Sequence, residues 1–590
     1  MAHLVGFKLL FALILLSFGC SEQQQTANTT PSASAPVVTD NPNDPDAIYV
    51  NGRIYTVADD QTWAEAIAIK DGKFVSVGSN EDVQALAGAG TELIDLEGSF
   101  AMPGIHDMHV HPSEGGEKYN FQCSFPFTHS MDQIVAKLTE CAANAPKGEW
   151  IIGGQWANEL IGSDTAPHKH ILDAISTEHP IHLGDSTVHA GWLNSAALEA
   201  MGINSDTPNP NGGVIAREAG TTEPTGILID NAYYETMRKL PRYSDAQYEQ
   251  AVQWAMAEMN KMGVTSIKDA LTSSSILGAY KRLDEKGSLT MKVATSIGWR
   301  MAWNDTLEQE RQNLLLRDNY RGKNVNTDFI KIMLDGIPPT RTAAMLEPYV
   351  PDALHGDKFT GKLIHTPEQL RLDLIELDAL GLTVKIHATG DRSLRVALDA
   401  FEAARKVNGD SGLRHEVSHA ELIHADDLPR FHQLNVTAEM SPILWYPSPV
   451  TAAMEKVIGS DRVSRFFPAR SLSDSGALVV YGSDWPSVVP DPSPWPGIEA
   501  MVSRKDPYSN SGAELGLEEA VDLATAIRIF TRNGSVAAKS VEQTGTIEVG
   551  KQADFIVLDQ NLFDIPVERI SDVKVLKTLV DGLVVYQQVQ

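Results

Sequence analysis

The chain has 590 residues, 43% of them hydrophobic, and a formal net charge of −29 at pH 7, which is an ordinary composition for a globular protein of more than one domain. Binding to a phosphate backbone needs a basic surface, so this charge argues against a nucleic-acid partner. The hydrophobic residues are sufficient for a large core, and a disordered segment is expected only at the start of the chain.

The first 20 residues have the pattern of an export signal. Lys8 precedes an apolar run over residues 9–18 that is too short to span a bilayer. The run leads to Cys20 in a stretch that resembles a bacterial lipoprotein cleavage site, although Ser17 stands where such sites usually have leucine. We expect export to the periplasm or cell envelope with a lipid anchor on Cys20; an ordinary secretory signal cleaved nearby is the alternative. Residues 21–45, rich in Ser, Thr, Gln and Pro, are expected to be a flexible linker.

Both ends of the mature chain have hairpin patterns. Asn51-Gly52, Asp71-Gly72 and Asp581-Gly582 each separate two runs rich in apolar residues, and these dipeptides favour the positive φ angles of tight hairpin turns. We therefore predict that residues 46–101 and 540–590 together build one small β-sandwich.

Between these ends the pattern changes to short apolar runs separated by helical stretches. Strands are predicted near residues 103–109, 264–269, 291–297, 329–335, 382–388, 414–420, 435–441 and 478–484, and helical patterns near 248–262 and 367–380 fall in the gaps. Eight such units predict a (β/α)8 TIM barrel over residues 102–539. The interval between the first two strands is too long for one crossover, so an inserted α/β subdomain is expected at about 113–260, with strands near 149–156 and 180–188.

Two cysteines, Cys123 and Cys141, follow the export signal and lie in the predicted insertion. In an oxidising compartment a disulfide between them would contribute about 3 kcal/mol, and two buried free thiols are the alternative. Two thiols alone do not complete a zinc site.

Histidines and acidic residues gather at the carboxyl ends of the predicted barrel strands, where barrel active sites form. His109 and His111 are two residues apart, so on an extended strand they point to the same side and could share one metal ion. Later predicted strands end in His387, His419 and Asp484. Lys331 lies inside an apolar strand, where burial of its charge is unfavourable unless the side chain is paired or modified. The convergence of these residues predicts a metal centre.

The motifs that carry these residues resemble the amidohydrolase superfamily, in particular its amidohydrolase 3 branch of YtcJ-like and N-substituted formamide deformylase-like proteins. The matching strings are PGIHDMHVHP at 103–112, FIKIMLDG at 329–336, VKIHATGD at 384–391, RHEVSHAE at 414–421, YGSDWP at 481–486 and GTIEVGKQADFIVLD at 545–559, with VHAGWLNSAAL at 188–198 in the insertion. The resemblance covers the chain from about residue 45 to its end.

The resemblance implies a role for each matched residue. His109 and His111 would bind a buried metal ion and His387 and His419 a more exposed one, while Asp484 would be both ligand and general acid/base. Lys331, carboxylated by carbon dioxide, would bridge two divalent ions, with zinc the best match to these ligands; an unmodified Lys331 paired with Asp335 is the alternative. The family usually has glutamate before the strand-six histidine and glutamine two residues after it, whereas this chain has Ser418 and Glu421. His106 and His415 are expected to be structural or to support the metal ligands without binding metal themselves.

The resemblance further implies a hydrolase that cleaves a non-peptide carbon–nitrogen bond of a small molecule through a metal-bound hydroxide. The alternatives are an ester, carbamate or deamination substrate, and a catalytically silent lipid-anchored binding protein. A homodimer is consistent with the family. Candidate substrate contacts are His189 and Asn194 in the insertion, and Trp299, Arg300, Arg341 and Tyr446 after barrel strands; plain packing is the alternative for the aromatic residues.

Overall fold

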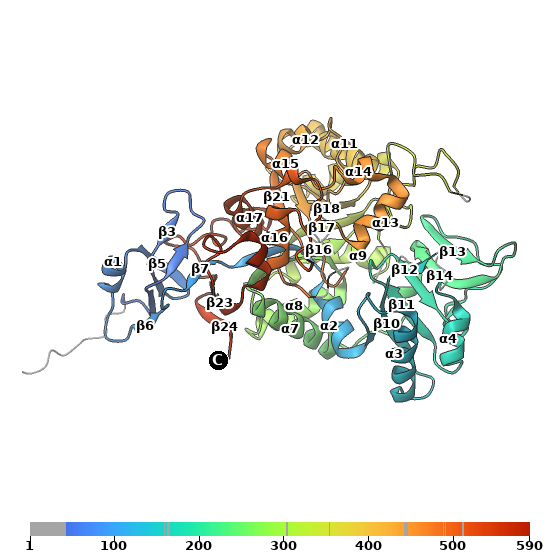
Figure 1. Ribbon diagram of the computed structural model, residues 1–590, viewed down its shortest axis with the longest axis horizontal. Coiled ribbons are helices and arrows are strands. Elements are labelled where there is room, and N and C mark those ends of the chain that lie inside the picture. The colour runs from blue at the N-terminus through green and yellow to red at the C-terminus, as the bar shows by residue number, and fades with distance from the viewer. Residues whose placement is uncertain are drawn as a thin grey trace, which may run out of the picture.

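The computed structural model describes residues 43–157, 160–161, 166–301, 305–352, 355–441, 446–487, 489, 491–509 and 512–589. These residues form four β-sheets and the helices around them, and Figure 1 shows a central body with the sheets of the chain ends on one side and the inserted sheet on the other. Cys20 lies outside the described residues. None of the described helices is both long and apolar enough to cross a bilayer.

The central sheet is a barrel of eight strands within the described residues, and each neighbouring pair is parallel. After β21 the chain closes onto β8, because the Asp484 N–H donates a hydrogen bond of 2.7 Å to the His109 carbonyl, and the His111 N–H donates one of 2.8 Å to the Trp485 carbonyl. The predicted TIM barrel is confirmed. Its strands are β8 (Ile105–Val110), β15 (Val264–Thr272), β16 (Lys292–Gly298), β17 (Val325–Met333), β18 (Thr383–Ala388), β19 (Glu416–His419), β20 (Thr437–Met440) and β21 (Leu478–Tyr481).

Helices follow the barrel strands and bury one face against them. In α11, for example, Leu394, Ala397, Leu398, Phe401 and Ala404 recur at helical spacing and are buried. The helices predicted in the gaps are α7 and α10, and α10 begins with Thr366 accepting a hydrogen bond from the Gln369 N–H. The helices after the insertion are α7 (Asp245–Lys261), α8 (Ser274–Glu285), α9 (Leu307–Leu315), α10 (Pro367–Ala379), α11 (Asp391–Asn408), α12 (Leu428–Gln433), α13 (Pro449–Ile458), α14 (Ser460–Val463), α15 (Ala469–Asp474), α16 (Trp495–Ser503), α17 (Leu523–Phe530) and α18 (Arg532–Ala537).

The two ends of the chain meet in a pair of sheets. In one, β6 (Glu92–Asp95), β1 (Ala47–Val50), β4 (Ala66–Lys70) and β5 (Lys73–Gly78) are neighbours, with the short helix α1 (Asn80–Gln84) beside them. In the other, β3 (Trp63–Ala64), β2 (Arg53–Tyr55) and β7 (Phe100–Pro103) continue into β22 (Phe555–Leu558), β23 (Val575–Val580) and β24 (Leu583–Gln587). Buried side chains of the two sheets form one core, in which the rings of Tyr49 and Phe555 lie 5.2 Å apart. Figure 1 shows these blue and dark red strands together.

Two of the three expected hairpins are present and one is wrong. Asp71-Gly72 joins β4 to β5 and Asp581-Gly582 joins β23 to β24, all four turn residues having positive φ. At Asn51-Gly52 the chain instead passes from one sheet to the other, since β1 pairs with β4 and β6, whereas β2 pairs with β3 and β7. Asn51 does have a φ of 56°, so the turn exists, but its direction leads the two strands apart.

The inserted segment between β8 and β15 has its own six-stranded sheet among the described residues. Its strands, in sheet order, are β13 (Gly213–Arg217), β14 (Pro224–Asp230), β12 (Ala190–Leu193), β11 (Ile181–Asp185), β10 (Ile151–Trp156) and β9 (Cys123–Ser124). The helices of the segment are α2 (Pro112–Phe121), α3 (Met131–Asn144), α4 (Lys169–Ile175), α5 (Ser195–Met201) and α6 (Asn231–Met237).

A disulfide joins Cys123 on β9 to Cys141 on α3 across a sequence separation of 18 residues. Because it restricts the unfolded chain, Cys141→Ser should lower the free energy of unfolding of the inserted segment by about 3 kcal/mol. The loss is measured by unfolding the protein in urea and detecting the unfolded insertion by its cleavage with a protease. Reduction of the disulfide in the unmodified protein should lower the free energy of unfolding by the same amount. An unchanged unfolding midpoint after complete reduction would contradict the prediction.

Candidate metal centre and active site

The first candidate ligands meet where the barrel closes. His109 at the end of β8 and His111 just after it direct their Nε2 atoms to the same Asp484 carboxylate oxygen, at 3.3 and 3.5 Å. Their donor atoms all lie within 4.8 Å of one another, a spacing that one metal ion can span. Asp484 has a φ of 58°, a left-handed conformation that is costly for a non-glycine residue and that recurs at functional sites.

A buried glutamate two strands away around the barrel orients His109. Glu439 on β20 places its carboxylate against Nδ1 of His109, and both side chains are almost fully buried. A carboxylate at one ring nitrogen fixes the orientation of an imidazole whose other nitrogen binds metal. The sequence analysis missed Glu439; an acidic residue inside the buried run of residues 437–440 was the available signal.

The remaining histidines continue a row of imidazoles. His419, the last residue of β19, lies between His109 and His387, with ring centroids 4.8 and 4.6 Å away. Burial, together with neighbouring cationic groups such as Lys331, lowers the pKa of each of these three histidines well below 6.5. They are therefore neutral at physiological pH, which is the form that binds metal ions.

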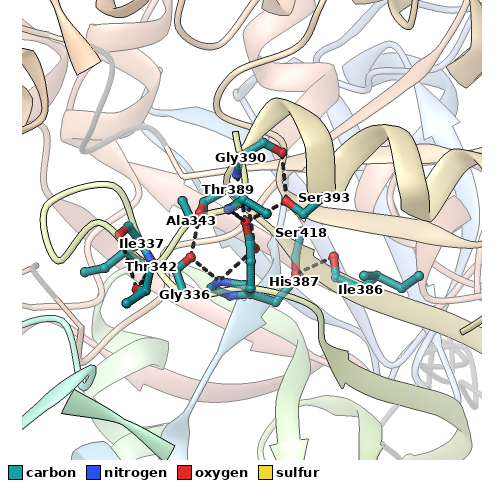
Figure 2. Close-up of polar contacts among 12 residues, drawn as sticks. Gly336, Ile337, Thr342, Ala343, Ile386, His387, Thr389, Gly390, Ser393 and Ser418 are labelled. Atoms are coloured by element: carbon teal, nitrogen blue, oxygen red, sulfur yellow. Dashed lines mark hydrogen bonds and ion pairs between the residues drawn. The ribbon is translucent and has the colours of Figure 1, made fainter. Parts of the chain in front are cut away.

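The loop that follows β17 supports His387. Nε2 of His387 lies 3.2 Å from the Gly336 carbonyl, and Figure 2 shows Thr389, Gly390 and Ser393 around the same turn. Asp335 organises the turn by accepting hydrogen bonds from the Gly390 N–H at 3.1 Å and from the Ser393 hydroxyl at 2.6 Å. The carboxylate of Asp335 is thus used by backbone and hydroxyl groups. No contact among the described residues joins Asp335 to Lys331, so the alternative in which Lys331 pairs with Asp335 is not found in the structure.

Lys331 on β17 is buried, and no carboxylate among the described residues lies in hydrogen-bond contact with it. Its Nζ donates to the Ser418 hydroxyl at 3.2 Å, and its strand neighbour is a second lysine, Lys385 on β18. Burial, with the positive charge of Lys385, lowers the pKa of Lys331 to about 7. A large fraction of the side chain is then an uncharged amine at neutral pH, the form that reacts with carbon dioxide.

Below this lysine, charged residues replace part of the usual apolar filling of the barrel. Lys268 on β15 is paired with Glu416, and Lys385 lies between Glu416 and Glu439, with Nζ to oxygen distances of 3.3 and 3.4 Å. All four side chains are at most 1% exposed. We call this set the ion ladder. Through Glu439 it reaches His109, so the charge inside the barrel is coupled to the candidate metal centre.

One cavity brings the candidate ligands together. It has a volume of about 90 Å³ and opens at the carboxyl ends of the strands, and its walls include His109, His111, Lys331, His387, His419 and Asp484. Apolar side chains complete much of the lining, among them Leu271, Met301, Ile337, Val450 and Met454. Glu114 and Glu421 also face it, and burial, with the charges of Asp335 and Asp484, raises the pKa of Glu421 well above its usual value.

His189 is the candidate substrate residue that lines the cavity. Its Nδ1 lies 2.7 Å from an oxygen of Asp230 and 3.0 Å from the hydroxyl of Tyr234, and its ring centroid is 5.6 Å from that of His387. Burial opposes protonation of His189, but the hydrogen bond to Asp230 and the surrounding carboxylates raise its pKa. The sequence analysis missed Asp230 and Tyr234, which become its partners only when β12 and β14 pair.

The other candidate substrate residues lie elsewhere. Arg300 is paired with Asp373 on α10 at 2.8 Å, Trp299 is buried beside it, and neither lines the cavity. Tyr446 lines a separate groove of about 660 Å³ that shares Val450 with the cavity.

Four further residues from the sequence analysis have structural partners. Asn194 caps α5, and Arg341 is paired with Asp352 at 3.0 Å. His106 contacts Thr544 at 3.1 Å and His415 contacts Asp378 at 3.0 Å, so both have the expected structural roles.

Several known proteins are similar to this chain over most of its length. The chain is 27% identical to the N-substituted formamide deformylase of Arthrobacter pascens, covering 92% of this chain and 98% of that protein. It is 29% identical to the protein LONG AFTER FAR-RED 3 of Arabidopsis thaliana over 92% and 91% of the two chains, and 28% identical to YtcJ of Bacillus subtilis over 92% and 99%. The fold matches that of an uncharacterized metal-dependent hydrolase from Pyrococcus horikoshii, with a TM-score of 0.69, 23% identity, and 88% and 99% of the chains covered. The model of the amidohydrolase family matches residues 92–586, and the chain belongs to that family.

Proposed function

We propose that the protein is a metal-dependent hydrolase that cleaves a non-peptide amide-type carbon–nitrogen bond in a small molecule. One observation carries the proposal: all six candidate ligands line the same cavity at the carboxyl end of the barrel, namely His109, His111, Lys331, His387, His419 and Asp484. The name of the Arthrobacter pascens relative supports an N-substituted formamide or a similar N-acyl amine as substrate.

The side chains present fit divalent metal ions. His109, His111 and Asp484 would hold one ion and His387 and His419 a second, with Lys331 between them once it is carboxylated. Neutral imidazoles and carboxylate oxygens suit zinc best among the common metals. When bound, such ions lower the pKa of a coordinated water to about 7 and polarise a carbonyl group.

The residues of the chain supply the remaining chemistry. Glu439 fixes the ring of His109 and the Gly336 carbonyl fixes that of His387, so the ligands are held before metal binds. Asp484, whose carboxylate oxygen lies 3.3 and 3.5 Å from the Nε2 atoms of His109 and His111, would take the proton of the attacking water and deliver it to the leaving nitrogen. The small, largely apolar cavity suits a short acyl group and excludes bulk water from the reacting carbonyl.

Carboxylation of Lys331 is supported by its lowered pKa and by the absence of a carboxylate partner in hydrogen-bond contact within the described structure. Lys331→Ala should reduce bound metal from close to two ions per chain to one or fewer, as measured by elemental analysis. Because the ammonium form of Lys331 dominates below about pH 7, labelled carbon dioxide, held at a constant dissolved concentration, should react with the apo-protein more slowly as the pH falls. Two ions retained by Lys331→Ala would contradict the bridging role.

The proposed reaction is tested by a substrate panel. The metal-loaded protein should hydrolyse N-substituted formamides and N-acyl amines, and chelation should abolish that activity. Preferential turnover of esters, carbamates or deamination substrates would favour the alternative reaction classes, and no turnover by fully loaded protein would favour the silent binding protein. Attachment of a lipid to Cys20, export and dimerisation stay predictions.

A further inference from the structure

A large groove lies beside the cavity, between the insertion and the barrel. It has a volume of about 660 Å³, against about 90 Å³ for the cavity. Pockets of about 300–1,000 Å³ hold drug-sized ligands, so the groove has room for a group that the cavity cannot accept. Most of its described lining residues are apolar or aromatic. The insertion contributes Tyr119, Cys123, Phe125, Pro126, Phe127 and Cys141, and the loops of the barrel contribute Tyr446, Pro449, Val450 and Tyr508.

The groove adjoins the cavity at two places. Val450, in the first turn of α13, lines both spaces, and Met454, one turn further along the helix, lines the cavity. Pro486 also lines the cavity, and its carbonyl accepts a hydrogen bond of 3.4 Å from Nζ of Lys118 and another from Nε2 of Gln155, two residues that line the groove. A substituent that leaves the cavity beside Val450 therefore lies in the groove.

Another recess adjoins the cavity, but its chemistry is different. It has a volume of about 130 Å³ and shares Glu114 and Val188 with the cavity. Its walls carry charged side chains, namely Glu117, Lys118, Asp185, Arg238 and Arg242. Removing such groups from water costs free energy that contact with an apolar substituent does not offset. The groove, rather than this recess, is therefore the space suited to an apolar group.

The walls of the groove are held in place without a ligand. The disulfide between Cys123 and Cys141 joins two of the lining residues, and the ring of Tyr119 stacks on that of Trp254 at 5.0 Å. A preformed site loses little entropy when a ligand binds. Tyr119 and Tyr508 nevertheless remain 49% and 57% exposed, so the groove presents aromatic surface to solvent. Exposed apolar surface of this kind marks ligand-binding grooves.

We propose that the groove binds an apolar substituent on the nitrogen of the scissile amide. The substrate is then an N-acyl amine with a short acyl group in the cavity and a long, uncharged alkyl or arylalkyl group in the groove. This inference rests on the proposed amide hydrolysis and specifies its substrate class. The direction follows from the sizes of the two spaces, because the cavity that would hold the scissile bond leaves room only for a short acyl group.

Two series of substrates test this assignment on the zinc-loaded protein. N-Alkylformamides from N-methyl to N-decyl lengthen the amine side, and N-methylamides from formyl to decanoyl lengthen the acyl side. Burial of one methylene group changes an equilibrium constant roughly fourfold, so kcat/KM should rise about two- to fourfold for each carbon of the N-alkyl series until the groove is filled. It should not rise with the acyl chain. A rise confined to the acyl series would overturn the assignment.

Variants of the groove test its part in this preference. Phe127→Asp places a charge in the wall, which must lose water when an alkyl chain covers it, and should lower kcat/KM for N-decylformamide at least about tenfold more than for N-methylformamide. Tyr508→Ala removes apolar surface and should change the same ratio by about threefold. Because the ratio compares two substrates on one preparation, partial unfolding of a variant does not change it. Tyr586→Ala, on β24 and outside both the cavity and the groove, is the matched control and should leave the ratio unchanged. An unchanged ratio in both groove variants would contradict the proposal.

Binding without turnover separates this proposal from the proposed reaction. Calorimetry on zinc-loaded protein should show that primary alcohols bind more tightly as the chain grows from hexanol to decanol, and Phe127→Asp should remove the trend. That result in a protein that hydrolyses no amide would refute the proposed reaction and leave the groove standing as an apolar binding site. Amide hydrolysis that is indifferent to the N-alkyl chain, with no binding of the alcohols, would overturn the groove assignment and leave the reaction standing. Conversion of a dimer into monomers by Phe127→Asp, with no change in the substrate ratio, would assign the groove to a second copy of the chain and also overturn the proposal.

Discussion

Replacing Asp484 with asparagine should lower amide turnover by roughly 10²–10⁴-fold while most of the bound metal remains, because a positioned acid/base group usually contributes this much. The asparagine keeps a carbonyl oxygen near His109 and His111, where the carboxylate oxygen now lies at 3.3 and 3.5 Å, but it cannot carry a proton. Asparagine also tolerates the left-handed φ of 58° at this position, so the fold should be unaffected.

The size of the loss should depend on the leaving group. An activated aryl ester departs without protonation and should lose less activity than an alkyl amide in Asp484→Asn, so rates are measured on both with metal content determined in parallel. Near-normal amide hydrolysis by metal-replete Asp484→Asn would mean that another group moves the proton. His189, held by Asp230 on the same cavity, is then the next residue to replace.

Lys385→Met should lower the free energy of unfolding by about 3–5 kcal/mol, because it leaves the buried carboxylates of the ion ladder without a shared cation. Nζ of Lys385 is 3.3 Å from Glu416 and 3.4 Å from Glu439, and also donates a hydrogen bond of 2.5 Å to the Met108 carbonyl. Denaturant unfolding of the metal-free protein measures the loss. Adding Glu439→Gln removes a buried carboxylate that Lys385→Met leaves without a cation. The double variant should therefore lose less free energy of unfolding than the two single variants lose in sum.

A surface lysine provides the matched control for the ion ladder. Lys406 on α11 is paired with Glu402 but its side chain is 71% exposed, so Lys406→Met should change the free energy of unfolding by no more than about 1 kcal/mol. If Lys385→Met costs no more than Lys406→Met, the buried charges do not hold the barrel together. Loss of metal affinity in Lys385→Met, with the fold intact, would show that the ladder acts on His109 through Glu439.

The fold and the metal-site candidates were predictable because they depend on local patterns. Apolar runs at crossover spacing indicated the eight barrel strands, and polar residues at the carboxyl ends of parallel strands necessarily share one end of a barrel. His109, Lys331 and His419 could therefore be grouped from sequence position, and the structure finds them around one cavity. The family resemblance supplied their separate roles.

The residues that were missed depend on how the strands are arranged in the barrel. Glu439 on β20 meets His109 on β8 past the intervening strand β21, and Lys385 lies opposite Glu416 on the adjacent strand, so neither contact follows from a local pattern. Arg300 follows a strand end, as a pocket residue would, but Asp373 on α10 draws it away from the cavity. The direction of the turn at Asn51-Gly52 is likewise decided by the sandwich that forms around it, not by the dipeptide.

The mixed sheet of the two chain ends constrains the order of events during synthesis. β7 runs within two residues into β8, which carries His109. One neighbour of β7 is β2, which is synthesised before it, and the other is β22, some 450 positions later. A ribosome must therefore release nearly the whole polypeptide before the strand leading into the first candidate metal ligands gains its second partner. Until then the nascent chain lacks the strand that completes the sheet next to β8, and this part of the chain stays accessible to proteases and chaperones.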